Sequence, residues 1–246
     1  MYVEQWGTTG AKVVLVHGGG AGGAANFLHQ KPLADRWTLL FPDRPGHGKT
    51  PANGRDDFEK DAPLIADLLG EGSHLVGHSY GGLGALLAAA LRPEAVLSLT
   101  LIEPAAFRIA QGNPDADEFT QSLIDLFQNP PEPEVFMLRF LELTGVPFRP
   151  PSPMPPPMIA SVQEILKMHV PWEADVPVEK LANSSFRKLV ITGGHSKAFD
   201  AIADALVAQI GGQRAVIPGM GHSVQDIGEP FNKVVEQFWL DQTEAR

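Results

Sequence analysis

The sequence predicts an α/β protein: a mostly parallel, doubly wound sheet with a helical lid inserted into it. Two observations lead to this prediction. Apolar, β-branched runs alternate with helical segments up to about residue 104 and again from about residue 184. Between these stretches the alternation stops, and proline-rich joints separate several helical segments. Continuous apolar runs are typical of strands buried on both faces, so we expect helices on both sides of the sheet.

Composition limits the classes of partner. The chain has 246 residues, enough for one large α/β domain, and its 19 Lys and Arg against 29 Asp and Glu give a net charge of −10. This charge argues against nucleic acid or an anionic membrane as the main partner. There is no cysteine, hence no disulfide framework and no thiolate metal site. Without a signal-peptide pattern or an apolar run near the ~20 residues of a membrane span, we expect a cytoplasmic protein.

Strands and helices are predicted to alternate in the first third of the chain. A short strand is expected within residues 2–7, followed by a buried strand that is β-branched and apolar over Lys12–His17. The next expected elements, in order, are a helix over Asn26–Arg36, a strand over Trp37–Phe41 and an amphipathic helix over Asp56–Leu69.

The stretch Gly77-His78-Ser79-Tyr80-Gly81 organises the rest of the sequence. An apolar run leads into it, and a run of small and apolar residues, predicted to be helical, leads out to Leu91. A serine at the tip of such a sharp strand–turn–helix junction sits in strained backbone geometry, and its neighbours at positions −2 and +2 must lack side chains. This is the G-x-S-x-G nucleophile elbow in its required context, and it predicts Ser79 as a nucleophile.

A further buried strand over Val96–Ile102 ends at Glu103, on the edge where α/β sheets place their ligands. We then expect residues 105–183 to form the helical lid, and residues 1–104 with 184–246 to form the core. The lid's expected helices span Asp115–Phe127, Glu134–Thr144 and Met158–His169. Its apolar residues, which look exposed in the sequence, predict a substrate pocket lined by Phe136, Met137 and Phe140.

The alternation resumes after the lid. The expected elements are a strand over Arg187–Gly193, a helix over Ala198–Ile210, a strand over Ala215–Ile217 and a last helix over Pro230–Leu240. His222 lies on the glycine-flanked loop Gly219-Met220-Gly221-His222, between the last strand and the last helix.

The glycine cluster Gly18–Gly23 directly follows a buried strand, which lets main-chain N–H groups approach a ligand. A dinucleotide-binding loop is one interpretation, but the next strand runs into the tight loop Pro42–Gly48 and not into a ribose-binding carboxylate. We favour an oxyanion loop, in which Gly19 and Tyr80 each donate one N–H and Gly18 borders the pocket. A purely structural glycine turn is the remaining alternative.

Four motifs carry a resemblance to a known family: His17-Gly18-Gly19-Gly20, Asp43-Arg44-Pro45-Gly46-His47-Gly48, Gly77-His78-Ser79-Tyr80-Gly81-Gly82 and Gly219-Met220-Gly221-His222. In this order and spacing they resemble the α/β-hydrolase fold superfamily, over the whole core apart from the lid. The resemblance implies serine hydrolase chemistry with no metal and no organic cofactor. By position it implies that His222 is the base that takes the proton of Ser79.

The acid of the triad departs from the family's usual pattern. The usual Asp after the strand that follows the lid has no counterpart in Gly193-Gly194-His195-Ser196, and Asp200 comes several residues late. Some members of the superfamily place their acid at the end of the strand after the elbow helix, where this chain has Glu103. We favour Glu103, and Asp200 stays open.

These inferences predict a lidded serine hydrolase that cleaves a small to medium hydrophobic ester or lactone through an acyl-enzyme. The glycine-rich loop also resembles that of hydrolases acting on carbon–carbon bonds in vinylogous diketone ring-cleavage products, which is the alternative activity. A non-hydrolytic, ligand-binding member of the fold is an alternative of another class. The expected partner is a small hydrophobic substrate, with no nucleic acid or membrane, and a homodimer is left open.

Overall fold

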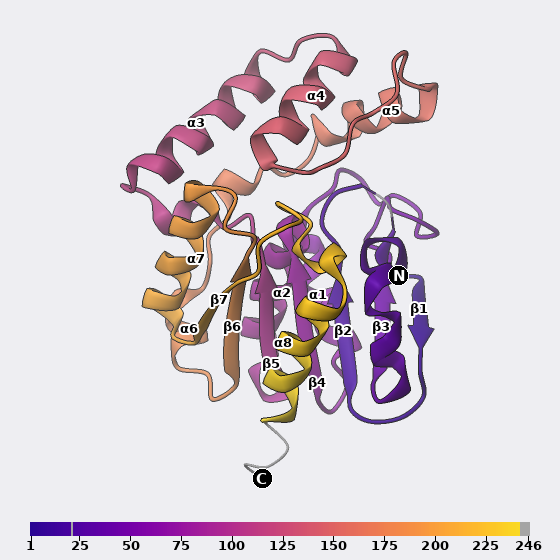
Figure 1. Ribbon diagram of the computed structural model, residues 1–246, viewed down its shortest axis with the longest axis vertical. Coiled ribbons are helices and arrows are strands. Elements are labelled where there is room, and N and C mark those ends of the chain that lie inside the picture. The colour runs from indigo at the N-terminus through magenta and orange to yellow at the C-terminus, as the bar shows by residue number, and fades with distance from the viewer. Residues whose placement is uncertain (21, 242–246) are drawn as a thin grey trace.

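The computed structural model describes residues 1–20 and 22–241, and its centre is one seven-stranded sheet in the order β1-β3-β2-β4-β5-β6-β7 (Figure 1). β1 pairs antiparallel with β3, and the other neighbours pair in parallel. The strands are β1 (Val3–Trp6), β2 (Lys12–Val16), β3 (Thr38–Pro42), β4 (Ser73–His78), β5 (Val96–Ile102), β6 (Arg187–Thr192) and β7 (Gln213–Val216). The predicted mostly parallel sheet is confirmed.

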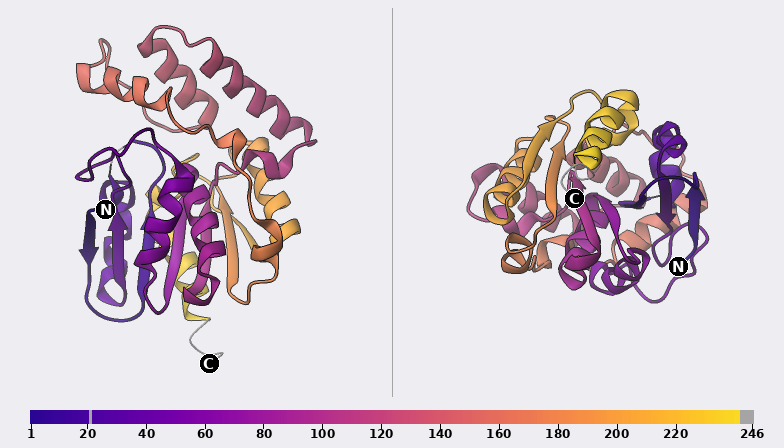
Figure 2. Two further views of the ribbon diagram at one scale, coloured as in Figure 1. Left: turned by 180° about the vertical axis from the view of Figure 1, so that it is seen from behind. Right: turned by 90° about the horizontal axis from the view of Figure 1, so that it is seen from below.

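Helices cover both faces of this sheet. They are α1 (Phe58–Leu68), α2 (Ser79–Leu91), α6 (Val178–Ala182), α7 (Lys197–Ile210) and α8 (Glu229–Leu240), with short 3-10 turns η2 (Pro93–Ala95), η3 (Phe107–Ala110), η4 (Pro171–Glu173) and η5 (Val224–Ile227). In Figure 1 α8 lies in front of the sheet, and in the view from behind (Figure 2) α1 and α2 do. None of the helices in the described residues is long and apolar enough to cross a membrane.

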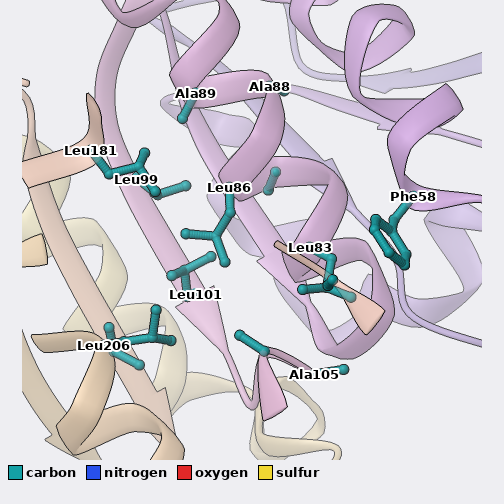
Figure 3. Close-up of a cluster of buried hydrophobic side chains, with 14 of the residues drawn as sticks. Phe58, Leu83, Leu86, Ala88, Ala89, Leu99, Leu101, Ala105, Leu181 and Leu206 are labelled. Atoms are coloured by element: carbon teal, nitrogen blue, oxygen red, sulfur yellow. The ribbon is translucent and has the colours of Figure 1, made fainter. Parts of the chain in front are cut away.

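Alternate residues of the strands face the two helix layers. Val14 and Val16 of β2 join the cluster that includes α1, α2 and α7, whereas Val13 and Leu15 join the cluster that contains Trp239 of α8. Figure 3 shows the first cluster, in which side chains of α2, β5 and α7 come together. Burial on both faces explains why the sequence of these strands is continuously apolar.

Most of the segment between β5 and β6 lies beyond one end of the sheet, away from the chain's C-terminus, whereas α6 at its end packs beside the sheet against α2 and α7 (Figures 1 and 2). Its main helices are α3 (Pro114–Gln128), α4 (Pro133–Thr144) and α5 (Pro156–Ile165). Each begins with proline at a position whose N–H needs no helical partner. We call residues 105–183 the inserted segment. Its boundaries and its role as a lid stay predictions.

Two predicted helices differ from the observed structure. Residues Gly23–Asp35 (η1) form 3-10 turns with a break at Phe27, where a regular helix was expected over Asn26–Arg36. Pro32 removes one helical N–H there, and Phe27 is fully buried against β3. Helix α5 ends at Ile165, and His169 instead donates its backbone N–H to the carbonyl of Asp56. The predicted helix over Met158–His169 is therefore too long.

Candidate active site

Ser79 stands at the junction of β4 and α2 with φ +52°. A Cβ at Gly77 would lie 2.6 Å from the Cβ of Ala85, and a Cβ at Gly81 would lie 2.1 Å from the carbonyl oxygen of His17. Such approaches exclude any side chain at either position. The two glycines of the elbow are therefore required by packing, and they permit the close packing that surrounds the strained serine.

Gly18 lies directly beside the serine. A Cβ at this position would come within 2.9 Å of the Cβ of Ser79 and 3.1 Å of Nδ1 of His78. The loop after β2 can therefore pass against Ser79 only with glycine at position 18.

Three side chains from separate elements meet above the strand ends. The hydroxyl of Ser79 donates to Nε2 of His222 at 2.9 Å, and Nδ1–H of His222 donates to Oε2 of Glu103 at 3.3 Å. In this tautomer the imidazole accepts from the serine and donates to the carboxylate. The arrangement has the connectivity of a Ser–His–acid triad.

Glu103 follows β5 with φ +44°, and its side chain is fully buried. Among the described residues, Ser79 and Glu103 are the non-glycine residues with positive φ. Backbone strain of this kind is concentrated at functional sites. Oε1 of Glu103 accepts the backbone N–H of Gly193 at 2.6 Å. Burial raises the pKa of Glu103 to about 7, although this N–H and the nearby His195 oppose the shift.

Asp200, the other candidate acid, has different partners. Its carboxylate accepts from the hydroxyl of Thr192 at 2.5 Å and from the guanidinium of Arg214 at 2.6 Å. Asp200 lies in the first turn of α7, which Ser196 caps. The geometry therefore brings Glu103, and not Asp200, to His222.

The loop that carries His222 is held by its backbone. The N–H of His222 donates to the carbonyl of Gly145 at 3.1 Å, and Nε2–H of His78 donates to the carbonyl of His222 at 3.0 Å. Burial, with a smaller contribution from His195, lowers the pKa of His222 to about 3. The imidazole is therefore neutral at rest and available as a base.

His195, ambiguous in the sequence, lies between the candidate acid and the inserted segment. Its Nε2–H donates to the carbonyl of Thr144 at 3.2 Å, and its Nδ1 lies 3.6 Å from Oε1 of Glu103. With the bond from His222 to Gly145, this joins the end of α4 to two histidines of the site. Sequence reasoning missed both contacts, because they connect residues more than 50 positions apart.

The predicted oxyanion donors come from two parts of the chain, the loop after β2 and the residue directly after Ser79. Gly19 follows the glycine that touches Ser79, and a Cβ at Gly19 would meet no atom within 4 Å, so open space lies beside it. Tyr80 directly follows Ser79, and its ring is buried against Phe58. Their roles as oxyanion donors stay predictions.

The predicted pocket residues occupy two environments. Phe136 and Met137 are buried in the inserted segment's own cluster with Leu126, Met154 and Val162. Phe140 is half-buried and also packs against the main core. Their role in substrate binding stays a prediction.

Within the described residues, one group has donor atoms close enough to hold a metal ion: Asp57, Glu59 and His169, all within 4.8 Å of one another. Asp57 already caps α1 and accepts from Nδ1 of His169. These structural bonds account for the cluster, and it carries no inference about a metal.

A family model described as the alpha/beta hydrolase family matches residues 13–237. The chain belongs to the α/β-hydrolase family. The matched residues include all four motifs and each of the three side chains that meet above the sheet.

Curated relatives of this α/β-hydrolase have several activities. The chain is 28% identical, over 93% of its length and 63% of the relative's, to a dihydrolipoyllysine-residue acetyltransferase component of an acetoin cleaving system from Cupriavidus necator. It is 36% identical, over 42% of its length and 40% of the relative's, to a pimeloyl-[acyl-carrier protein] methyl ester esterase from Methylococcus capsulatus. It is 32% identical, over 49% of its length and 46% of the relative's, to a 2-hydroxy-6-oxo-6-phenylhexa-2,4-dienoate hydrolase from Burkholderia cepacia. The chain thus spans less than two thirds of the length of these relatives.

Solved structures share the fold of this α/β-hydrolase. A lipase-esterase related protein from Clostridium acetobutylicum matches with a TM-score of 0.71 and 15% identity, over 96% of this chain and 98% of that one. A meta-cleavage product hydrolase from Pseudomonas fluorescens matches with a TM-score of 0.64 and 22% identity, over 99% and 94%. At these identities the likeness concerns the fold alone.

Proposed function

We propose that this α/β-hydrolase is a serine hydrolase that cleaves small to medium hydrophobic esters or lactones through an acyl-enzyme. The observation that carries the proposal is the chain of hydrogen bonds from Ser79 through His222 to Glu103. A serine hydroxyl is a poor nucleophile near neutral pH and needs a base within hydrogen-bond reach. His222 supplies that base at 2.9 Å.

In the acylation step, Oγ of Ser79 attacks the carbonyl carbon of the substrate while its proton passes to Nε2 of His222. The carbonyl oxygen becomes an oxyanion, which the N–H groups of Gly19 and Tyr80 stabilise. When the intermediate collapses, the bond to the leaving alkoxide breaks and His222 returns the proton to it. The products are an alcohol and the acyl-Ser79 ester.

In the deacylation step, water attacks the acyl carbon and gives a proton to His222. The second oxyanion collapses, Ser79 leaves with that proton, and a carboxylic acid is released. Glu103 stabilises the imidazolium in both steps and keeps Nδ1–H directed toward itself. A lactone follows the same steps, with the alcohol remaining part of the product.

The apolar composition of the inserted segment supports a hydrophobic substrate, and an esterase among the relatives supports an ester. Carbon–carbon bond hydrolysis of a vinylogous diketone is the second candidate. The relative from Burkholderia cepacia, named as a hydrolase of a substrate of this class, supports it. The cytoplasmic location and the homodimer remain predictions.

The test combines a covalent probe with a substrate panel. A fluorophosphonate should label wild-type protein, and peptide mass mapping should place the adduct on Ser79. Purified protein should turn over p-nitrophenyl esters or lactones faster than vinylogous diketones. The opposite preference would favour carbon–carbon bond hydrolysis, and binding of the panel without labelling or turnover would favour a ligand-binding protein.

The matched variant is Ser79→Ala, which removes the nucleophile. Loss of a catalytic serine can cost on the order of 10⁶ in turnover. A variant that keeps more than about a hundredth of the wild-type rate would contradict the assignment of Ser79.

A further inference from the structure

The carbonyl of Gly18, in the loop beside Ser79, is held by two side chains. One Nη of Arg44 donates to it at 2.9 Å, and Nδ1–H of His17 donates to it at 2.9 Å. The tautomer of His17 is fixed, because its Nε2 accepts the backbone N–H of Arg44 at 3.0 Å. Both lone pairs of this carbonyl therefore have donors on the interior side of the loop.

The direction of the Gly19 N–H follows from that of the Gly18 carbonyl. The peptide between Gly18 and Gly19 is trans, and in a planar trans peptide the C=O and the N–H point in opposite directions. With the carbonyl directed toward Arg44 and His17, the N–H of Gly19 points away from them. A Cβ at Gly19 would meet no atom within 4 Å, so no side chain crowds the loop there, directly after the glycine whose Cβ would meet Ser79.

The same arginine and a neighbouring histidine hold the loop on either side of this peptide. Nε of Arg44 donates to the carbonyl of His17 at 3.1 Å, and Nδ1–H of His47 donates to the carbonyl of Gly20 at 3.1 Å. Glycine has the largest backbone freedom of any residue, so a run of glycines keeps one conformation only when other groups impose it.

Arg44 is itself fixed by two carboxylates. Its guanidinium is fully buried and bonds to Asp56 and, at 2.9 Å, to Asp61. Nε2 of His47 lies 3.0 Å from Oδ2 of Asp56. Burial favours the neutral form of Asp56, but Arg44 and His47 outweigh it and hold the pKa of this carboxyl well below its usual range. Asp56 therefore stays ionised and keeps the Arg44 guanidinium in place.

The backbone of Asp56 also bonds to the side chain of Tyr80, the residue whose N–H is the second predicted oxyanion donor. The hydroxyl of Tyr80 donates to the carbonyl of Asp56 at 3.2 Å and to that of His169 at 2.8 Å. The guanidinium carbon of Arg44 lies 4.9 Å from the centre of the Tyr80 ring. The residues that carry both oxyanion donors are thus tied to the Arg44–Asp56 pair.

We propose that Arg44 is a positioning residue of the oxyanion hole: it turns the Gly18–Gly19 peptide so that the Gly19 N–H faces the reacting carbonyl oxygen, with His47 in support. The proposal rests on the proposed serine hydrolase function. It gives a role in catalysis to a buried charge that touches neither Ser79 nor His222.

The test is Arg44→Lys, which keeps the positive charge between Asp56 and Asp61 but removes the planar fork that reaches the carbonyls. Loss of one oxyanion donor costs ~10² to 10³ in kcat, and partial loss of its orientation should cost roughly 10- to 100-fold. KM for the best ester should stay within about threefold, because the effect is confined to the transition state. The inhibition constant of phenylboronic acid, whose adduct with Ser79 is a tetrahedral anion, should rise by the same factor as kcat/KM falls.

The matched control is Arg214→Lys. Arg214 also bonds two carboxylates, Asp200 and Asp204, and one carbonyl, that of Ala215, but none of its bonds reaches the oxyanion loop. This variant should keep kcat and the boronate affinity within about twofold of wild type. A second variant, His47→Gln, should lower kcat about 3- to 10-fold at unchanged KM, and it decides the matter if Arg44→Lys does not fold.

The outcomes separate the two proposals. Suppose that the wild type is active and that a folded Arg44→Lys or His47→Gln variant keeps the wild-type kcat and boronate affinity. This result would overturn the positioning role and leave the proposed function standing. Equal losses of substrate and boronate affinity would also overturn it, since they indicate a general distortion. A wild type that reacts with neither fluorophosphonate nor boronate would contradict the proposed function itself.

Discussion

Two buried ionic centres lie on opposite sides of Ser79, and they are built differently. The Arg44 guanidinium has partners on every side: Asp56, Asp61 and the carbonyls of His17 and Gly18. Burial opposes its charge, but the two carboxylates outweigh burial and raise the pKa of Arg44. Glu103 has one backbone N–H and a neutral histidine as its bonded partners, and burial raises the pKa of its carboxyl to about 7.

The difference separates a charge that holds structure from a charge that responds to the reaction. A fully paired arginine forms no new interaction when the substrate reacts, so its role is to hold the neighbouring groups in place. In the mechanism we propose, the underpaired carboxylate of Glu103 gains a cationic partner when His222 takes the proton of Ser79. Stabilisation that appears only as the transition state forms is the kind that accelerates a reaction.

The largest expected effect is at Glu103. Glu103→Gln should lower kcat by roughly 10³- to 10⁴-fold, because the imidazolium loses its counter-charge and the tautomer of His222 is no longer fixed. Steady-state kinetics on the best ester would measure it, with circular dichroism as a check on the fold.

The control is Asp200→Asn, since Asp200 pairs with Arg214 and Thr192 and not with His222. Its kcat should stay within about threefold of wild type. If Asp200→Asn is the damaging variant and Glu103→Gln is not, the assignment of the acid is wrong.

The second-largest expected effect is on stability, at the paired Arg44 centre. Arg44→Met should lower the free energy of unfolding by ~3 to 5 kcal/mol, because it leaves Asp56 and Asp61 buried without their cation. Urea denaturation of the variant and wild type at pH 7 would measure this. A loss below about 1 kcal/mol would mean that water or rearrangement replaces the arginine, and the contrast between the two centres would fail.

The third prediction uses pH. The pKa of Glu103 rises from an ordinary value of 4.5 to about 7 on folding, so the native state holds this proton more tightly than the unfolded state does. Its contribution to stability therefore falls as pH rises from about 4.5 to about 7, by on the order of 3 kcal/mol in total. Over the same range kcat/KM should rise, because the ionised carboxylate is the active form.

Urea denaturation at pH 4.5, 6 and 8 would check this prediction, with Glu103→Gln as the reference that lacks the titrating group. The difference in stability between the variant and wild type should move in the variant's favour as pH rises. A difference that is constant across this range would contradict the raised pKa.

The smallest effect is expected where the inserted segment touches the site. Gly145 and Gly211 both follow helices with positive φ, +73° and +74°, but Gly145 is in the left-handed helical region and Gly211, with ψ 173°, is in a region that essentially only glycine adopts. Alanine should therefore cost about 1 to 2 kcal/mol of stability at Gly145 and about 1 to 3 kcal/mol at Gly211. A Cβ at Gly145 would lie 2.3 Å from two atoms of the His195 ring, whereas one at Gly211 would meet nothing within 4 Å. Gly145→Ala should therefore lower kcat by roughly tenfold, and Gly211→Ala should not. Equal activity of the two variants would show that the end of α4 does not position the site.

The sequence predicted those parts of the site that depend on local geometry. The strand–turn–helix setting of Ser79 and the need for Gly77 and Gly81 follow from steric rules within five residues. Glu103 was found as a candidate because it ends a strand, and strand ends in parallel sheets share an edge. The sequence already favoured Glu103 over Asp200, but the contact with His222 that supports this preference joins residues 119 positions apart and appears only in the structure.

What sequence analysis missed depends on long-range contacts. Arg44 lies within a recognised motif, but the sequence does not show its partners. Its ion pairs with Asp56 and Asp61 and its hydrogen bond to the Gly18 carbonyl form only when α1 and the loop after β2 pack together. The break at Phe27 has the same origin, because tertiary burial of that ring overrides local helical preference. Pro32 was the available signal against a regular helix there.

The bond from the His222 N–H to the Gly145 carbonyl has a consequence for building chimeras. Exchanging the whole inserted segment for another would also remove the backbone carbonyl that holds His222, the base of the proposed mechanism. Grafts that keep the turn after α4 and replace only the stretch from about residue 147 to residue 165 leave that support intact. This shorter stretch is thus the part of the insertion that can be redesigned independently of the chemistry.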